Sequence, residues 1–178
     1  DPYLSRGLGD VYKRQLVRAL ELVEAQGGSV TTITVGTASD DPTIRKALAI
    51  GANDAVRIDA DPSDPHFVAK QIAEYAKNEN YDIILTGKET INYNGSQIGG
   101  MIAEMLNTPF VSLATKLDVT NNVATLERDV KGGVEVVEVI TPFVLSAAKG
   151  MAEQRIPNMR GIMAVSYTHL TLPTKCWV

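Results

Sequence analysis

Apolar and polar positions predict alternating helices and strands along the chain as far as Pro109. Apolar residues at helical spacing begin at Leu16 and stop at Gly27-Gly28, and Ser29–Val35 then alternates β-branched residues as a strand does. This order favours a parallel sheet with right-handed crossovers. The later elements are a helix from Asp40-Asp41-Pro42 to Gly51, a strand at Ala55–Ile58, a helix from Pro65 to Asn78, a strand at Ile83–Leu85 and a helix from Ile98 to Leu106.

The pattern changes after Pro109, where strand-like runs follow one another with no helix between them. Two of the joints are Asn121-Asn122 and Lys131-Gly132-Gly133, and Asn and Gly tolerate the positive φ that tight hairpins need. We therefore expect a parallel α/β core with an antiparallel hairpin excursion. Leu126–Ser146 is a candidate functional segment, but the pattern by itself favours an ordinary edge hairpin with solvated charges. The predicted strands are Phe110–Val119, Val123–Val130, Val134–Ile140 and Phe143–Ala147.

The stretch from Tyr81 to Pro109 joins a buried strand, a Gly-rich polar loop and a helix. Such a junction points unpaired N–H groups and the positive end of the helix dipole past the end of the strand. An anion such as a nucleotide phosphate suits this position. Alternatively, Asn94 or Ser96 only caps the helix and the glycines only turn the chain. The pattern alone leaves both interpretations open.

Both ends of the chain look foreign to the fold. Residues 1–15 and 165–178 show no periodicity that joins their neighbours and resemble translated adapter sequence, which leaves a single α/β domain at 16–164. That domain keeps 13 of the 17 basic and 19 of the 21 acidic residues, and its net charge of −6 disfavours nucleic-acid binding. The only cysteine, Cys176, lies outside it, and His66 alone makes no plausible metal site.

The sequence also argues against catalysis and against a membrane span. Gly87-Lys88-Glu89 lacks the earlier glycine and the following Ser/Thr of a P-loop, and a helix cap explains Asp40-Asp41. We therefore predict no catalytic residues. The apolar runs fall far short of the roughly 20 residues that cross a bilayer, and no signal-peptide pattern is present. A cytoplasmic-type location is the expectation.

A family resemblance adds to this interpretation. The hairpin residues resemble, in order and spacing, the signature of the β subunit of electron transfer flavoprotein, and the likeness extends over about Leu16 to Ala164. Lys131 stands where the signature usually has an acid, and Asn92-Tyr93-Asn94 where many members are acidic. The residues that carry the resemblance are Glu127-Arg128, Gly132-Gly133, Glu135, Val137, Pro142 and Val144-Leu145-Ser146, with Thr31–Gly36, Ile44–Gly51, Gly87-Lys88, Asn94–Met101 and Ile156–Met163 beyond them.

The resemblance implies a redox carrier subunit that is not itself an enzyme. In the family, an α and a β subunit share one FAD, held mostly by α, and β buries a structural AMP. Electrons pass from acyl-CoA and related dehydrogenases, as in fatty acid oxidation, to a membrane quinone oxidoreductase. The implied location is the bacterial cytoplasm or the mitochondrial matrix. The implied fold is a Rossmann-like sheet of the adenine nucleotide alpha hydrolase type, whose first and central strand is apparently missing from this chain.

The resemblance also implies three sets of site residues. The AMP phosphate would meet backbone N–H groups of the loop before the last helix, Gly99 would permit close approach, and an apolar anchor at Ile156 would dock into a dehydrogenase. Arg128 would fix the hairpin or the subunit contact. The cofactor-binding set is Gly36, Gly87, Lys88, Asn94, Gly95, Ser96, Gln97, Ile98 and Gly99; the partner-binding set is Arg155, Ile156, Pro157 and Met159; the interface or signature set is Arg128, Gly132, Gly133 and Glu135.

Two rival classes share the broad architecture. A stress-type nucleotide-binding protein would need a Gly-rich ATP loop followed by Ser/Thr, and an ATP-pyrophosphatase-type enzyme would need a Ser-Gly-Gly-x-Asp loop at its first strand. Neither class needs the hairpin or the Ile156 segment, so the flavoprotein is favoured. Because a sheet without its central strand exposes apolar faces, we also expect the isolated 178-residue chain to be poorly stable or to aggregate.

Overall fold

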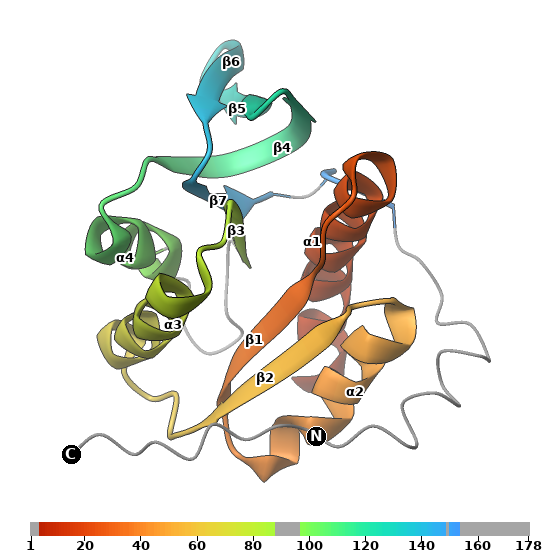
Figure 1. Cartoon of the computed structure of the whole chain (residues 1–178), viewed down its shortest axis with the longest axis vertical. Helices are drawn as coiled ribbons and strands as arrows, with labels where there is room; N and C mark the ends of the chain where they lie inside the picture. The colour runs from red at the N-terminus through yellow and green to blue at the C-terminus, as the bar shows by residue number, and fades with distance from the viewer. Residues whose placement is uncertain (1–3, 88–96, 149, 154–178) are drawn as a thin grey trace.

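The computed structural model describes residues 4–87, 97–148 and 150–153 as a mixed α/β fold (Figure 1). The predicted order of helices and strands is confirmed. Two sheets are present in the described part, one with the strand order β1-β2 and one with the order β3-β7-β4-β5-β6. The elements are α1 (Leu4–Gln26), β1 (Thr31–Gly36), the short 3-10 helix η1 (Ala38–Asp40), α2 (Asp41–Ile50), β2 (Asp54–Asp59), α3 (Pro65–Glu79), β3 (Ile83–Gly87), α4 (Gln97–Leu106), β4 (Phe110–Thr120), β5 (Val123–Val130), β6 (Gly133–Ile140) and β7 (Phe143–Ala147).

The large sheet combines parallel and antiparallel strands. β7 lies between β3 and β4 and pairs with both in parallel, while β4, β5 and β6 form an antiparallel meander. The turn residues have the predicted backbone: φ is +51° at Asn121, +66° at Asn122 and +99° at Gly132. Both the parallel core and the hairpin excursion are therefore confirmed.

The small sheet is separate from the large one, whereas the order of helices and strands predicted a parallel sheet and the family resemblance implied that its central strand is missing. β1 and β2 pair in parallel from Thr31 opposite Asp54 to Gly36 opposite Asp59. Among the described residues, nothing pairs with the second edge of β1 or of β3. Two strands belong to one sheet only if they pair directly or through strands that lie between them. None of the described strands pairs with both β1 and β3, so the two sheets are separate.

Helices cover both faces of the large sheet. Leu22 of α1 packs on one face, against a buried cluster that includes Leu117, Leu126 and Leu145. On the other face, α3 and α4 bury Ala69 and Ile102 against Val144 of β7 and its neighbours. α1 also packs Leu16 and Leu20 against Ala47 of α2 and against Val30 and Ala52, which lie just before β1 and β2. One helix therefore contributes to two apolar clusters, one beside each sheet.

The first helix begins earlier than the sequence suggested. We expected no helical structure before Leu16, but α1 begins at Leu4. Helix formation is cooperative, so a helix that packs from Leu16 onward can extend into neighbours without an apolar stripe. The separate expectation that residues 1–15 are foreign to the fold stays a prediction, as does the same expectation for residues 165–178, which lie outside the described residues.

Local sequence explains the starts of α2 and α3 differently. Asp64 caps α3, because its Oδ1 accepts a hydrogen bond from the His66 N–H at 3.0 Å, and Pro65 follows at the first helical position. Asp40 makes no such bond at the start of α2. The cap predicted for Asp40-Asp41 is therefore wrong in its chemistry, since Asp41 instead forms an ion pair with Arg57 at 2.8 Å.

Candidate functional site

At the β3–α4 junction, which the sequence singled out, a glycine allows the strand and the helix to pack closely. A Cβ added at Gly99 in the first turns of α4 would lie 2.5 Å from Thr86 Oγ1 and 2.8 Å from the ring of Phe110. Thr86 is itself fixed, because its hydroxyl donates to the Leu145 carbonyl at 3.0 Å. Gly99 therefore lets α4 pack closely against the end of β3. This packing accounts for the glycine without a ligand, so the predicted approach of a nucleotide to Gly99 stays a prediction.

The predicted cofactor residues divide into those the structure describes and those it does not. Gly87 is the exposed last residue of β3, and Gln97 and Ile98 open α4, exposed and half-buried respectively. Gly36 ends β1 in the other sheet, where a Cβ would lie 2.1 Å from Asp40 Oδ2. The structure thus assembles Gly87, Gln97 and Ile98 at one junction but gives no contact between them and Gly36. Lys88, Asn94, Gly95 and Ser96 lie outside the described residues.

Arg57 is a buried cation that the sequence analysis missed. It is 5% exposed, and its guanidinium lies 2.8 Å from Asp41 Oδ1 and 2.8 Å from Asp59 Oδ1. Nη1 also donates to the Gly36 carbonyl at 3.3 Å. The side chain therefore ties together the ends of β1 and β2 and the start of α2. The available signal was an arginine between Val56 and Ile58 in an otherwise apolar strand. With two carboxylates beside it, Arg57 is a structural ion-pair centre.

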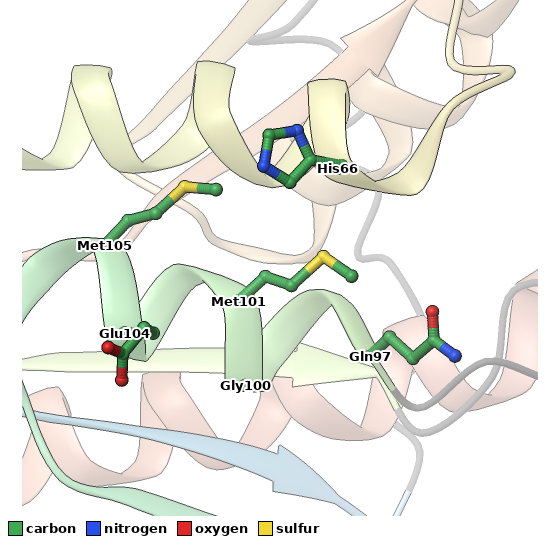
Figure 2. Close-up of a pocket in the computed structure, with 6 residues that line it drawn as sticks. All are labelled: His66, Gln97, Gly100, Met101, Glu104 and Met105. Carbon is green, nitrogen blue, oxygen red and sulfur yellow. The ribbon is translucent and has the colours of Figure 1, made fainter.

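An apolar groove lies between α3 and α4 (Figure 2). Its volume is about 480 Å³, and it opens beside the first residues of both helices. Met101 is half-buried here, whereas its neighbour Ile102 is fully buried. The groove is lined by His66, Gln97, Gly100, Met101, Glu104 and Met105. One imidazole and one carboxylate among methionines do not make a nucleophile–base arrangement.

The signature residues of the hairpin contact one another. Arg128 stands opposite Glu135 in the β5–β6 register, and its Nε donates to the Glu135 carboxylate. Arg128 Nη1 also reaches Ser112 Oγ of β4 at 3.2 Å. Gly132 forms the turn with a φ of +99°, which favours glycine. These residues therefore fix the hairpin. Their part in a subunit contact stays a prediction.

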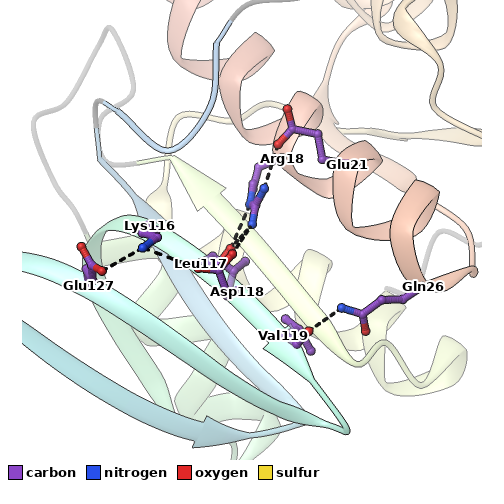
Figure 3. Close-up of polar contacts among 8 residues, drawn as sticks. All are labelled: Arg18, Glu21, Gln26, Lys116, Leu117, Asp118, Val119 and Glu127. Atoms are coloured by element: carbon purple, nitrogen blue, oxygen red, sulfur yellow. Dashed lines mark hydrogen bonds and ion pairs between the residues drawn. The ribbon is translucent and has the colours of Figure 1, made fainter.

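A second unforeseen arginine joins α1 to the base of this hairpin (Figure 3). Arg18 Nε donates to the Leu117 carbonyl at 2.9 Å, and Nη2 contacts Asp118 Oδ1 at 3.0 Å. Gln26, further along α1, donates to the Val119 carbonyl. Beside them, Lys116 forms an ion pair with Glu127 at 3.0 Å, and this hydrogen bond raises the pKa of Lys116. The far end of β4 is therefore anchored to α1.

Tyr75 is the group with the largest resolved pKa change among the described residues. Burial, with the neighbouring Tyr81 as the next cause, raises the pKa of Tyr75 to about 12. The two rings stack with centroids 6.5 Å apart. Perturbed groups gather at many active sites, but Tyr75 lies on α3 away from the β3–α4 junction. Its pKa reflects ring packing.

The described residues offer neither a metal-binding cluster nor a membrane-spanning helix. No group of three or more His, Cys, Asp or Glu side chains there could hold a metal ion. Within the same residues, no helix combines the length and the apolar character needed to cross a membrane.

Comparison with known proteins identifies the family. The family model described as the electron transfer flavoprotein domain matches residues 10–168. The chain is 35% identical to electron transfer flavoprotein subunit beta of Bacillus subtilis over 149 residues, which is 82% of this chain and 58% of the relative. It is 36% identical to the mitochondrial beta subunit of Oryza sativa subsp. indica, over 82% of this chain and 60% of the relative. The human beta subunit is 30% identical, over 75% of this chain and 54% of the relative.

These relatives are therefore longer than the matched chain, which spans 54–60% of their length. The match nevertheless includes both sheets, the β3–α4 junction and the hairpin. The chain belongs to the electron transfer flavoprotein family, and the relatives that it matches are beta subunits.

Proposed function

We propose that the chain serves as the beta-type subunit of a heterodimeric electron transfer flavoprotein. In this proposal, FAD held mainly by the alpha subunit carries electrons from acyl-CoA and related dehydrogenases to a quinone oxidoreductase, and an AMP sits in this chain as a structural ligand. The chain itself contributes no catalytic residue. Support comes from the family match over residues 10–168 and from the names of the relatives. A bacterial cytoplasm or a mitochondrial matrix would suit this role.

The β3–α4 junction is the observation that carries the AMP proposal. Gly99 packing holds the start of α4 beside the carboxyl end of β3, where unpaired N–H groups and the helix dipole favour an anion. The first turn of α4 carries no acidic residue that would repel a phosphate. The backbone of Ser96, Gln97 and Ile98 would donate to the phosphate, and Lys88 would offset its charge.

The remaining residues of the proposed sites complete this assignment. Asn94, Gly95 and Gly87 would shape the loop around the phosphate, and Gly36 would approach the nucleotide from the end of β1. The segment with Arg155, Ile156, Pro157 and Met159 would dock a dehydrogenase through the apolar side chain of Ile156. Several of these residues lie outside the described part of the chain: Lys88, Asn94, Gly95 and the docking segment.

The Rossmann-like sheet is part of the same proposal. We infer that the two sheets are halves of one doubly wound sheet, with a further strand between the free edges of β1 and β3. Two helices support this inference, because α1 packs against both β3 and α2, while α3 packs against both β1 and α4. Each helix therefore bridges the two halves. The strand would come from the part of the family protein that this chain does not match.

Co-expression with an electron transfer flavoprotein alpha subunit tests the function. The proposal predicts a yellow one-to-one complex whose absorbance spectrum is that of bound flavin. A complex without flavin, or no complex at all, would contradict the proposal. The readout is direct, because neither rival class is expected to bind a flavin together with a second subunit.

Gln97→Glu tests the AMP site in that complex. A carboxylate in the first turn of α4 stabilises the helix N-terminus but repels a phosphate bound there. We expect the affinity for AMP, measured by calorimetry, to fall about tenfold, in line with the energies of charge pairs near a helix end. Gln97→Ala is the matched control and should bind AMP nearly as well as the parent, because the backbone N–H groups remain. Equal affinity of the Glu variant would place the AMP elsewhere.

A further inference from the structure

Two methionines of α4 line the groove between α3 and α4. Met101 and Met105 are four residues apart, so they share one face of the helix. Figure 2 shows both thioether side chains extending from α4 toward α3. Each of the two residues is half-buried. Both side chains therefore face the same groove and remain partly open to solvent.

The groove is large enough to admit a small oxidant. Its volume is about 480 Å³, whereas a water molecule takes up about 30 Å³ of the liquid, and hydrogen peroxide is about the size of two waters. Peroxide converts the thioether of methionine to a sulfoxide, at a rate that depends on access to the sulfur. Met101 and Met105 are therefore open to this oxidant in the folded chain.

Met151 stands in the opposite environment within the described residues. It is 6% exposed and belongs to the buried cluster that contains Leu117 and Leu145. Peroxide reaches a sulfur atom in such a cluster only when the surrounding packing opens. The chain therefore offers its own comparison between accessible and enclosed methionines.

Oxidation of the groove methionines would change the packing between α3 and α4. Met101 and Met105 pack against a buried cluster that includes Ala69, Ile102 and Ala103. A flexible, apolar thioether suits such a position, whereas a sulfoxide carries a polar oxygen. Placing that oxygen against apolar side chains costs free energy. The contact between the two helices is therefore sensitive to the oxidation state of two sulfur atoms.

We propose that Met101 and Met105 form a site of reversible oxidation by hydrogen peroxide, at which conversion to methionine sulfoxide loosens the packing of α4 on α3. In each step, a lone pair of the sulfur attacks a peroxide oxygen and the O–O bond breaks. The proton of the transferred oxygen passes to the departing hydroxide, which leaves as water, so the sulfur loses two electrons and the peroxide gains them. Methionine sulfoxide reductases reverse the modification. The site goes beyond the proposed function and does not depend on it.

The first experiment maps oxidation in the 178-residue chain. A short pulse of hydrogen peroxide, in native buffer and in urea, is followed by peptide mass spectrometry, which gives the oxidation rate of each methionine in both states. We expect Met101 and Met105 to react within about threefold of their rates in urea, and Met151 to be slowed at least about tenfold by folding. Protection of Met101 and Met105 as strong as that of Met151 would overturn the site.

The second experiment measures the effect on packing. After the pulse, we expect the thermal midpoint of the parent chain to fall by about 3–6 °C, because a polar oxygen enters an apolar contact. The double variant Met101→Leu/Met105→Leu removes both sulfur atoms at similar volume, and its midpoint should not change after the pulse. Met151→Leu is the matched control and should lose as much as the parent. Circular dichroism before the pulse checks that the variants fold.

Each outcome decides the proposal. A fall in the midpoint that a methionine sulfoxide reductase reverses and that the double leucine variant lacks supports it. An unchanged midpoint in a parent chain whose Met101 and Met105 are oxidised overturns the effect on packing. An equal fall in the double leucine variant would assign the effect to other methionines and would also overturn it. None of these outcomes bears on flavin binding, which the co-expression experiment tests separately.

Discussion

β3 and β7 are neighbouring parallel strands of five residues with similar apolar content, yet their burial differs. Every residue of β7 is buried, whereas Ile83 to Thr86 of β3 are only half-buried and Gly87 is exposed. β7 pairs on both edges, and β3 pairs only with β7. The burial of a strand therefore depends on its neighbours in the sheet and not on its composition alone. β3 has the sequence of a central strand in the position of an edge strand.

The pair Leu85 and Leu145 gives the largest expected difference. These residues stand opposite each other in the β3–β7 register, but Leu145 is fully buried. We expect Leu145→Ala to lower the free energy of unfolding by about 3–4 kcal/mol and Leu85→Ala by about half as much, because cavity cost grows with burial. Urea denaturation of the two variants measures this difference. Equal losses would mean that β3 is as enclosed as β7.

Arg57→Ala sharpens the comparison between the two sheets. Apolar packing stabilises the large sheet, whereas Arg57 joins β1, β2 and α2 in the small one. Removing it takes away the guanidinium that lies 2.8 Å from Asp41 Oδ1, and we expect a loss of about 2–3 kcal/mol, below the full value for a buried pair because Asp59 is 70% exposed. Thermal unfolding is the measurement. The exposed pair of Lys77 with Glu74 is the control, and Lys77→Ala should change stability by less than about 0.5 kcal/mol.

Gly99→Ala tests how tightly α4 is held to the end of β3. The new Cβ would lie 2.5 Å from Thr86 Oγ1, so we expect a loss of about 1–2 kcal/mol. Gly100→Ala is a close control, because its Cβ would come no nearer than 3.7 Å to Phe110. That variant should be neutral or slightly stabilised, since alanine favours a helix. If both variants behave alike, the close approach of α4 to β3 is not required for folding.

The sequence predicted what local pattern encodes. Apolar periodicity located the helices and strands. The hairpin turns were predicted from Asn121, Asn122 and Gly132, because these residue types tolerate a positive φ. The contacts of Arg57 and Arg18 could not be predicted, because they join segments that are distant along the chain. Gly99 was singled out for the approach of a ligand, which stays a prediction, and the contacts of Thr86 and Phe110 that also leave no room for a Cβ there could not be foreseen.

Apolar periodicity located neither the boundary between the two sheets nor the helical residues before Leu16, for related physical reasons. Periodicity predicts that β1 and β3 belong in a parallel sheet but carries no information on which strands are adjacent. Likewise, an apolar stripe locates the packed part of α1 but not how far the helix extends beyond it. The AMP loop, the docking segment around Ile156 and the foreign character of both ends stay predictions of the sequence and of the family.

Amide hydrogen exchange along β3 and β7 tests the central claim most directly. In a parallel ladder, the N–H groups of a strand point alternately to its two neighbours. We predict that every amide of Phe143–Ala147 is strongly protected, while alternate amides of Ile83–Gly87 exchange nearly as fast as those of unfolded chain. Uniform protection along β3, equal to that of β7, would show that another segment already pairs with its free edge and would contradict the account of β3 as a central strand without its second neighbour.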